Sequence, residues 1–437
     1  MASITQRTIS QAGLATKASR KEVVAVRAVA QPRKVIQLGS CAGKRPQLTQ
    51  LFDYTKASSV GFTAASSTVP EERRSVVAQA VAVEAPPKPV IKASQYEIFT
   101  LTTWLLKEEM KGTIDGELAT VISSVALACK QISSLVNRAG ISNLTGVAGN
   151  QNVQGEDQKK LDVVSNEVFK NCLASSGRTG VIASEEEDQP VAVEETYSGN
   201  YIVVFDPLDG SSNIDAGISV GSIFGIYEPS EECSLDAMDD PQKMMEQCVV
   251  NVCQPGSRLK CAGYCLYSSS TVLVITIGNG VFGFTMDPLI GEFVLTHPNV
   301  RIPEAGKIYS FNEGNYALWD EGVRAYMDSL KDPAKWGGKP YSARYIGSLV
   351  GDFHRTLLYG GIYGYPGDAK NKNGKLRLLY ECAPMSFIAE QAGGAGSTGT
   401  ARVLDVNPEK VHQRVPLFIG SKKEVEYLES FTKKGGK

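Results

Sequence analysis

The chain has 437 residues, 42% of them hydrophobic and 21% charged, with a formal net charge of -2, so it is long enough for two domains that each bury a core. It contains no run of eighteen or more apolar residues, which argues against a membrane-spanning role. Nine cysteines are too few for a disulfide scaffold at this length.

The small net charge hides an asymmetry between the N-terminal segment and the rest. Residues 1–70 contain ten Lys or Arg against two acids, Glu22 and Asp53, and carry +8, so the remainder carries -10. Spaced bases among Ser, Thr and Ala, without an apolar signal core, are typical of an organelle transit peptide. We predict a transit peptide and processing region over 1–80 and a linker over 81–97. The alternative is a basic tail that binds nucleic acid or an acidic membrane.

The first half of the folded region is predicted to contain two helices followed by strands. Apolar residues recur at three- and four-residue spacing from Leu118 to Val136 and stop at Gly140, a pattern that predicts an amphipathic helix. A second helix is predicted over 160–173. Short β-branched or aromatic segments predict strands over 181–183, 201–205, 222–227, 271–277, 281–286 and 293–296. This order indicates a large sheet behind two helices.

The second half alternates strands and helices. Strands are predicted over 308–311, 362–365 and 415–419, and helices over 318–330, 345–359, 383–392 and 423–432. Alternation of this kind indicates an α/β sandwich. We predict an N-terminal metal-site domain over 98–300 and a C-terminal domain over 301–437.

Acidic residues follow two of the predicted strands. Ser-Glu-Glu-Glu-Asp stands at 184–188, and Asp-Pro-Leu-Asp-Gly-Ser-Ser stands at 206–212. Acids at the carboxyl ends of strands lie on the ligand-binding rim of an α/β sheet. With only three histidines in the chain, none near a cysteine at metal spacing, oxygen ligands favour Mg²⁺ or Mn²⁺ over zinc. The turn through Gly210 exposes backbone amides to an anion, so metal and phosphate can meet there, as phosphoryl transfer requires.

These features also have a purely structural interpretation. An acidic run is usually a solvated face, and Asp-x-x-Asp-Gly marks many turns, including calcium loops. The segment 375–381 (Lys-Leu-Arg-Leu-Leu-Tyr-Glu) weighs against that interpretation, because an acid again ends an apolar stretch, beside two bases suited to phosphate.

The run from Asp206 to Asp215 closely resembles the signature of fructose-1,6-bisphosphatases. Segments 159–163, 343–348, 354–357 and 375–382 resemble that family in order and spacing, so the resemblance covers roughly residues 98–430. It implies a layered α-β-α-β-α sugar-phosphatase fold with two α/β subdomains. It also implies Mg²⁺-dependent hydrolysis of the 1-phosphate of fructose 1,6-bisphosphate to fructose 6-phosphate and phosphate.

The resemblance implies a role for individual residues. Asp162 and Glu186 would be catalytic, orienting and deprotonating the attacking water. The metal ligands would be Glu156, Glu185, Asp206, the carbonyl of Leu208, Asp209 and Glu381. The leaving phosphate would contact Gly210, Ser211 and Arg377, and the rest of the substrate would contact Asn312, Tyr316, Tyr345, Tyr365, Lys375 and, from a neighbouring subunit, Arg344. Tyr316 stands one place out of register with the tyrosine of the animal enzymes.

Two features differ from the animal members. Ala119 and Asn200 stand where those enzymes have a threonine and a lysine that hold an inhibitory nucleotide, so we expect no inhibition by adenosine monophosphate. An added acidic stretch at 228–255 resembles the regulatory insertion of plastid members, which thioredoxin controls.

The resemblance to plastid members implies redox control, a chloroplast stromal location, a role in photosynthetic carbon fixation and starch synthesis, and a homotetramer. A disulfide between Cys233 and Cys248 would close a short polar loop without a core of its own, and Cys253 is the alternative partner of Cys248.

Three other functions compete with this interpretation. A sedoheptulose bisphosphatase would share the metal chemistry and differ mainly in its sugar pocket. An inositol-phosphate phosphatase is disfavoured by the run from Asp206 to Asn213. A non-catalytic sugar-phosphate sensor would not need the water-activating pair, Asp162 and Glu186.

Overall fold

The computed structural model describes residues 98–151, 157–193, 201–229 and 241–433, all of which belong to one compact unit, Pro89–Lys437. The predicted transit peptide and linker, Glu156, Asn200 and Cys233 lie outside the described residues.

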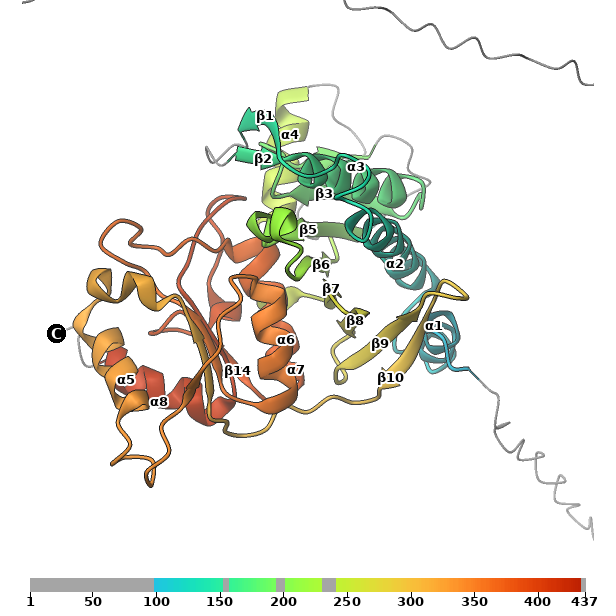
Figure 1. Ribbon diagram of the computed structural model, residues 1–437. Coiled ribbons are helices and arrows are strands. Elements are labelled where there is room, and N and C mark those ends of the chain that lie inside the picture. The colour runs from blue at the N-terminus through green and yellow to red at the C-terminus, as the bar shows by residue number, and fades with distance from the viewer. Residues whose placement is uncertain (1–97, 152–156, 194–200, 230–240, 434–437) are drawn as a thin grey trace, which may run out of the picture. The chain divides into compact units, whose positions relative to one another are not determined.

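The first sheet has eight strands (Figure 1), of which the four central strands are buried along their whole length. Its order is β10 (Glu292–His297), β9 (Phe282–Asp287), β8 (Thr271–Thr276), β7 (Cys261–Tyr267), β6 (Val220–Tyr227), β5 (Tyr201–Asp209), β3 (Thr179–Ser184) and β4 (Val191–Ala192). Only the β3–β5 pair is parallel. In β5, Ile202 and Val204 pack into one core cluster and Val203 and Phe205 into the other, so the apolar run reflects burial on both sides.

One face of this sheet is covered by α1 (Leu101–Met110), α2 (Gly116–Val136) and α3 (Lys160–Ala174). By length and composition α2 could cross a membrane, and it is the one such helix among the described residues. Its apolar stripe, which includes Val121, Ile122 and Val125, is fully buried in the core cluster that α2 shares with α3 and the sheet. Asp115 caps the helix by accepting the N–H of Leu118 at 2.7 Å, which satisfies one of the free amides at the helix start.

The second sheet has five strands in the order β12 (Ser342–Ala343), β11 (Ile308–Phe311), β13 (Ile362–Tyr365), β15 (Leu417–Gly420) and β14 (Ala395–Ser397). Helices α6 (Leu349–Tyr359) and α7 (Ala383–Gln391) lie between the two sheets, and α5 (Glu321–Lys331) and α8 (Lys422–Thr432) cover the outer face of the second. The predicted α-β-α-β-α layering is therefore confirmed. The 3-10 turns are η1 (Ser211–Ala216), η2 (Gly256–Arg258), η3 (Glu313–Leu318) and η5 (Val403–Asp405).

Several local predictions were wrong. The predicted helix 345–359 begins at Leu349, because the Ser348 hydroxyl caps it by accepting the N–H of Gly351 and Gly347 has a positive φ of 84°. The apolar stretch within 375–381 received no helix prediction, yet it forms the π-helix η4 (Leu378–Cys382), which leads directly into α7; Arg377 before it makes one isolated bridge. The antiparallel pair β1 (Val147–Gln151) and β2 (Asp157–Lys159), as well as α1, was not predicted.

The stretch 228–255 also differs from the expected polar loop. Its second half forms α4 (Pro241–Val252), in which Cys248 and Val252 are buried in the core, while Cys253 is half-buried. The helix contacts β3, β4 and β5. Cysteine is accommodated in an apolar core as readily as an aliphatic side chain. Cys248 and Val252 therefore form a short apolar face on α4, which the acidic composition of the whole stretch did not reveal.

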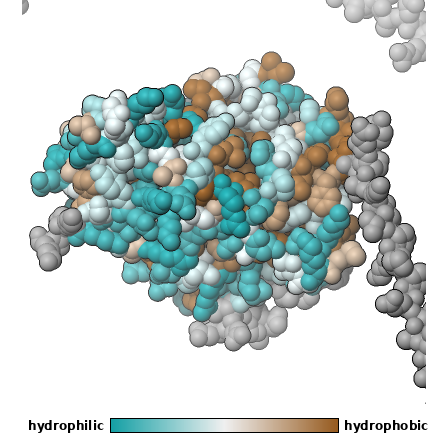
Figure 2. Space-filling view, turned by 90° about the horizontal axis from the view of Figure 1, so that it is seen from below, coloured by the Kyte–Doolittle hydropathy of each residue, from teal (hydrophilic) through white to brown (hydrophobic). Residues whose placement is uncertain are grey.

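Some apolar side chains are exposed. The face shown in Figure 2 is largely hydrophilic on its left side and carries its hydrophobic surface toward the centre and right. Over all faces, the exposed apolar residues include Leu106 and Met110 of α1, Ile141 after α2, and Leu289 between β9 and β10.

Candidate active site

A cavity of about 350 Å³ lies where the carboxyl ends of β3 and β5 meet the N-terminus of α6 and the η4 turn. Its lining includes six acids, Asp162, Glu185, Glu186, Asp206, Asp209 and Glu381, but only two bases, Lys375 and Arg377. The two acidic segments and the 375–381 segment therefore meet in one cavity, as the sequence predicts. Carboxylates in this number, beside two bases, are suited chemically to cations or to cations together with an anion.

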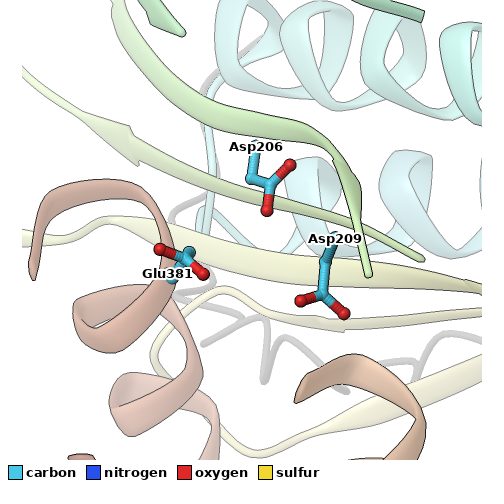
Figure 3. Close-up of side chains that lie close together, drawn as sticks. All are labelled: Asp206, Asp209 and Glu381. Carbon is cyan, nitrogen blue, oxygen red and sulfur yellow. The ribbon is translucent and has the colours of Figure 1, made fainter. Parts of the chain in front are cut away.

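Three of these carboxylates converge closely (Figure 3). Each of Asp206, Asp209 and Glu381 offers an oxygen within 4.8 Å of the others, and all three are buried. Asp206 and Asp209 come from β5, whose register shifts between them, and Glu381 comes from η4 across the cavity. An irregular strand end and an opposing π-helix thus present oxygen ligands to a common point, which is a frequent use of π-helical turns.

The N-terminus of α6 holds Asp209 in place. The Asp209 carboxylate accepts the Ser348 hydroxyl at 2.8 Å and the N–H of Val350 at 3.0 Å. At Gly210, φ is 76° and a Cβ would lie 3.0 Å from the Cβ of Ser348, so only glycine suits both the backbone and the close approach. The positive end of the helix therefore stabilises this carboxylate.

Arg377 neutralises part of the acidic cluster. Its Nη2 atom lies 2.8 Å from Oε1 of Glu185 and its Nη1 atom 3.9 Å from Oε2 of Glu381. Its backbone N–H donates to the same Glu381 oxygen at 2.6 Å. One buried guanidinium thus connects β3's acidic end to η4.

The pKa values show how strongly these acids are crowded. Burial, together with the nearby Glu185, Glu381 and Asp209, holds the pKa of Asp206 well above its usual range. Burial raises the pKa of Glu381 to about 8 despite Arg377, and that of Asp209 to about 6 despite its helix contacts. The protein alone does not stabilise all of these negative charges.

The predicted catalytic pair lies at the edge of the same cavity. Asp162, in the first turn of α3, accepts the N–H of Lys159 at 2.8 Å, while its Oδ1 atom is buried without a hydrogen bond to a described residue. Burial and the neighbouring Glu186 and Glu185 raise the pKa of Asp162 to about 8. Glu186 accepts the side-chain amide of Gln158 at 2.5 Å. A buried acid that titrates near neutrality, beside a second carboxylate, can exchange a proton with bound water.

The predicted sugar-phosphate residues divide into two groups. Tyr345, Tyr365 and Lys375 line the cavity, as do Gly210 and Ser211 at its other end. Asn312 and Arg344 do not line it; Arg344 is exposed, and its guanidinium donates to the carbonyl of Ala343.

Tyr316 also lies away from the cavity. Its hydroxyl donates to Asp328 at 2.7 Å, and the Nζ atom of Lys331 lies 4.9 Å from the centre of its ring. Both partners belong to α5, so the side chain is held against that helix.

The sequence analysis assigned no role to six residues that line the cavity: Gln158, Ser212, Gly347, Leu349, Tyr363 and Leu376. It also missed Ser348, which donates to Asp209 without lining the cavity. Ser348 could have been found, because a serine before an apolar run is a helix-start signal. Gln158 and Tyr363 carry no such signal, since a strand glutamine and a core tyrosine are common without a functional role.

The chain matches two family models and many curated and solved proteins. The model described as "Fructose-1-6-bisphosphatase, N-terminal domain" matches residues 99–298, and the corresponding C-terminal domain matches residues 302–433. A chloroplastic fructose-1,6-bisphosphatase of Brassica napus is 72% identical over 343 residues, covering 78% of this chain and 83% of that protein. One from Arabidopsis thaliana is 71% identical over 343 residues, covering 78% and 82%.

Solved structures agree with this assignment. The holo form of Leishmania major fructose-1,6-bisphosphatase superposes with a TM-score of 0.72 at 43% identity, over 77% of this chain and 99% of that one. Its T-state structure gives 0.68 at 42% identity, over 77% and 99%. The two family models cover most of the residues, and the relatives match both in sequence and in fold. The chain therefore belongs to the fructose-1,6-bisphosphatase family.

Proposed function

We propose that this chain hydrolyses the 1-phosphate of fructose 1,6-bisphosphate, with Mg²⁺, to give fructose 6-phosphate and phosphate. The observation that carries the proposal is the convergence of Asp206, Asp209 and Glu381 in a cavity that also contains Lys375. A metal end and a basic end in one cavity fit a substrate with two phosphates.

The residues present fit a divalent metal ion, as the family implies. Six acids face two bases in the cavity, and the raised pKa values of Asp206 and Glu381 show unrelieved negative charge that a cation would stabilise. Carboxylate and carbonyl oxygens suit Mg²⁺; the proposed ligands are Glu185, Asp206, the carbonyl of Leu208, Asp209, Glu381 and, outside the described residues, Glu156. When bound, the ion supplies positive charge to the phosphate oxygens and lowers the pKa of water.

The protein's own groups position the reactants. One ionised carboxylate of the Asp162–Glu186 pair accepts a proton of the attacking water, whose oxygen forms the new bond to phosphorus. The bond from phosphorus to the sugar oxygen breaks, and that oxygen takes up a proton from solvent water to give the sugar hydroxyl. The amides of Gly210 and Ser211, at the start of η1, and the Arg377 guanidinium hold the departing phosphate. Lys375, Tyr345, Tyr365 and Asn312 bind the other phosphate and the sugar.

The proposed assembly is a homotetramer in which Arg344 of each subunit reaches the cavity of its neighbour. Two observations support this. The Arg344 side chain is exposed and does not line its own cavity, and apolar residues such as Met110 and Leu289 are exposed. Tyr316 would contact substrate only if assembly moved it from Asp328.

Thioredoxin is the proposed redox partner, acting on a disulfide between Cys233 and Cys248, with Cys253 as the alternative partner. Cys248 lies buried on α4, which contacts β3 and β5. Glu185 directly follows β3, and Asp209 ends β5. A change in the packing of α4 against these strands can therefore shift the positions of both carboxylates.

The remaining proposals concern location and organisation. Residues 1–80 would direct import into the chloroplast stroma, 81–97 would link to the enzyme, and 98–300 and 301–437 would form its metal-site and sugar-phosphate domains. The relatives of Brassica napus and Arabidopsis thaliana are named chloroplastic. The product would then serve photosynthetic carbon fixation and starch synthesis.

Phosphate release from fructose 1,6-bisphosphate tests the proposal. The full chain and the chain lacking residues 1–80 would be assayed with and without Mg²⁺, before and after reduction by a dithiol. Mg²⁺-dependent release that rises on reduction supports both the activity and the switch. Phosphate release that does not change on reduction would support the activity and contradict the redox switch. Faster release from sedoheptulose bisphosphate would identify that compound as the preferred substrate.

The disulfide assignment has its own variant. Cys233→Ser cannot form a bridge from residue 233, so it should be active without reduction. If oxidation still inactivated Cys233→Ser fully, the Cys233–Cys248 pairing would be wrong and Cys253 would be tested next as the partner of Cys248.

A further inference from the structure

Asp352, in the first turn of α6, is a fully buried carboxylate that does not line the cavity. Its oxygens accept the backbone N–H of Ile346 at 2.9 and 3.1 Å and that of Gly347 at 3.1 Å. The loop before α6, which carries Arg344 and Tyr345, is therefore folded back onto the helix. A buried charge with such backbone contacts is costly to disturb.

Arg355, one turn further along α6, joins the same carboxylate to two other segments. Its Nη2 atom lies 2.5 Å from Oδ1 of Asp352 and donates to the carbonyl of Arg344 at 3.0 Å. The same atom donates to the Ser310 hydroxyl at 2.9 Å. Ser310 lies on β11, two residues before Asn312. One guanidinium thus connects the helix, the loop and the strand that carry the proposed sugar-phosphate contacts.

The N-terminal end of α6 is fixed to the metal end of the cavity. The Ser348 hydroxyl and the Val350 amide bind Asp209. On β6, a Cβ at Gly221 would lie only 2.6 Å from a methyl of Val350, so the helix packs directly on the first sheet. One helix therefore holds a metal-end carboxylate at its start and the sugar-phosphate loop one turn later.

We propose that the Asp352–Arg355 ion pair is a positioning device that fixes the sugar-phosphate end of the cavity relative to the metal end. The proposal rests on the proposed function, because a substrate with two phosphates must reach both ends at once. A displacement of about 1 Å in such an arrangement can cost about a hundredfold in rate. Neither residue lines the cavity, so both act through the loop before α6, whose Tyr345 and Gly347 do line it.

The test uses Asp352→Asn and Arg355→Lys in the full chain. Calorimetry gives the Kd for fructose 6-phosphate without metal, and kinetics gives KM and kcat for fructose 1,6-bisphosphate at saturating Mg²⁺. We expect Asp352→Asn to raise Kd and KM about tenfold, as loss of a charge-assisted contact does. The kcat and the Mg²⁺ concentration for half-maximal activity should stay within about twofold, because the contacts to Asp209 remain. Arg355→Lys keeps the charge but not the three-way contact, and should show an intermediate effect.

Glu424→Gln on α8 is the matched control. Glu424 is also a buried carboxylate; it accepts the Tyr341 hydroxyl at 2.9 Å and the Gly306 amide at 3.3 Å and does not line the cavity. It should lose stability with Kd unchanged. An equal rise of Kd in Glu424→Gln, or an unchanged Kd in Asp352→Asn and Arg355→Lys, would overturn the proposal. If Asp352→Asn does not fold, Arg355→Lys decides the matter alone. If the wild-type chain binds fructose 6-phosphate without hydrolysing the bisphosphate, the proposed function fails while the Kd comparison still tests the positioning role.

Discussion

The two ends of the cavity hold their charged groups in different ways. At the metal end, Asp206 and Glu381 are each only 2% exposed, and Asp209 is bound by a helix terminus. At the proposed sugar-phosphate end, Lys375 is exposed and Tyr345 is 39% exposed. Buried acids are fixed by the fold whether or not a ligand is present, whereas exposed bases find their geometry when substrate or a neighbouring subunit arrives.

This difference separates two kinds of contribution to catalysis. Groups held in a dry, rigid cluster act mainly on the chemical step, because their field is in place before the transition state forms. Exposed bases at the other end contribute mainly uniform binding, which lowers KM and leaves kcat nearly unchanged. Substitutions at each end should therefore have distinct kinetic signatures.

The largest effect is expected at the metal end. Asp206→Asn removes one of the three converging carboxylates and should lower kcat by about a thousandfold or more, because metal catalysis supplies several kcal/mol. The same substitution removes a carboxyl whose pKa is raised by burial and by the neighbouring acids, so the metal-free variant should melt at a higher temperature than the wild type. Steady-state kinetics with Mg²⁺ and thermal unfolding with a chelator measure the two outcomes.

Asp188→Asn is the control for that substitution. Asp188 ends the acidic run at 184–188, which contributes Glu185 to the cavity, but it is exposed and does not line the cavity, so activity and melting temperature should stay near the wild-type values. Comparable losses in both variants would mean that the acids act through their overall charge and that the metal end has no special rigidity.

A smaller effect, of the other kind, is expected at the sugar-phosphate end. Lys375→Gln removes a base that lines the cavity and should raise KM for fructose 1,6-bisphosphate by about 10- to 100-fold, as loss of a charged hydrogen bond does. The kcat should change by less than about threefold. Lys372→Gln, on the same loop but outside this cavity, should leave KM unchanged. A fall in kcat of Lys375→Gln without a rise in KM would contradict the idea that the two ends of the cavity contribute differently to catalysis.

The two ends also differed in what the sequence could predict. The acids follow apolar strands or an apolar stretch, so sheet geometry alone predicts that Glu185, Asp206 and Asp209 lie together, and they do. Glu381 was placed with them because it ends an apolar stretch, but sheet geometry does not explain its position, since Glu381 belongs to the π-helix η4. The Asp352–Arg355 ion pair could not be predicted from the sequence. Its role depends on the loop before α6, which folds back so that its backbone groups contact both side chains.

The insertion shows a further limit of sequence reasoning. Composition at 228–255 is acidic, which predicted an exposed loop, yet Cys248 and Val252 pack in the core. Two or three buried positions on a short helix are too few to produce a clear periodicity. The exact start of a helix is equally hard to predict, because a single capping side chain can determine it, as Ser348 does for α6. Tertiary contacts decide which of several possible capping residues is used.

The third prediction concerns α6, the helix that joins the two ends. His354 of α6 contacts the Tyr264 hydroxyl of β7 through Nδ1 at 2.8 Å, and burial, with a smaller effect of His297, lowers the pKa of His354 to about 4. The unfolded chain takes up this proton near pH 6.5 and the folded chain only near 4. Stability is therefore complete above about pH 6.5 and is lost as the pH falls toward 4, by about 3 kcal/mol at most.

His354→Gln keeps a polar side chain and cannot take up the proton. Denaturant unfolding at pH 7.5 and pH 5 should show a smaller loss of stability in the variant than in the wild type. An equal loss in both would assign the acid sensitivity to other groups and leave α6 firmly attached to the first sheet throughout this range.

The smallest effect is expected at Tyr316, where the resemblance and the structure point in different directions. The resemblance predicts a substrate contact, but the side chain donates to Asp328, lies beneath Lys331 and does not line the cavity. Tyr316→Phe should therefore change KM by less than about twofold, whereas Tyr365→Phe, at a tyrosine that does line the cavity, should raise KM by about two- to tenfold through the loss of one hydrogen bond. Equal rises in the two variants would show that α5 releases Tyr316 when the subunits assemble, and the sugar-phosphate end would then be completed by movement as well as by a neighbouring chain.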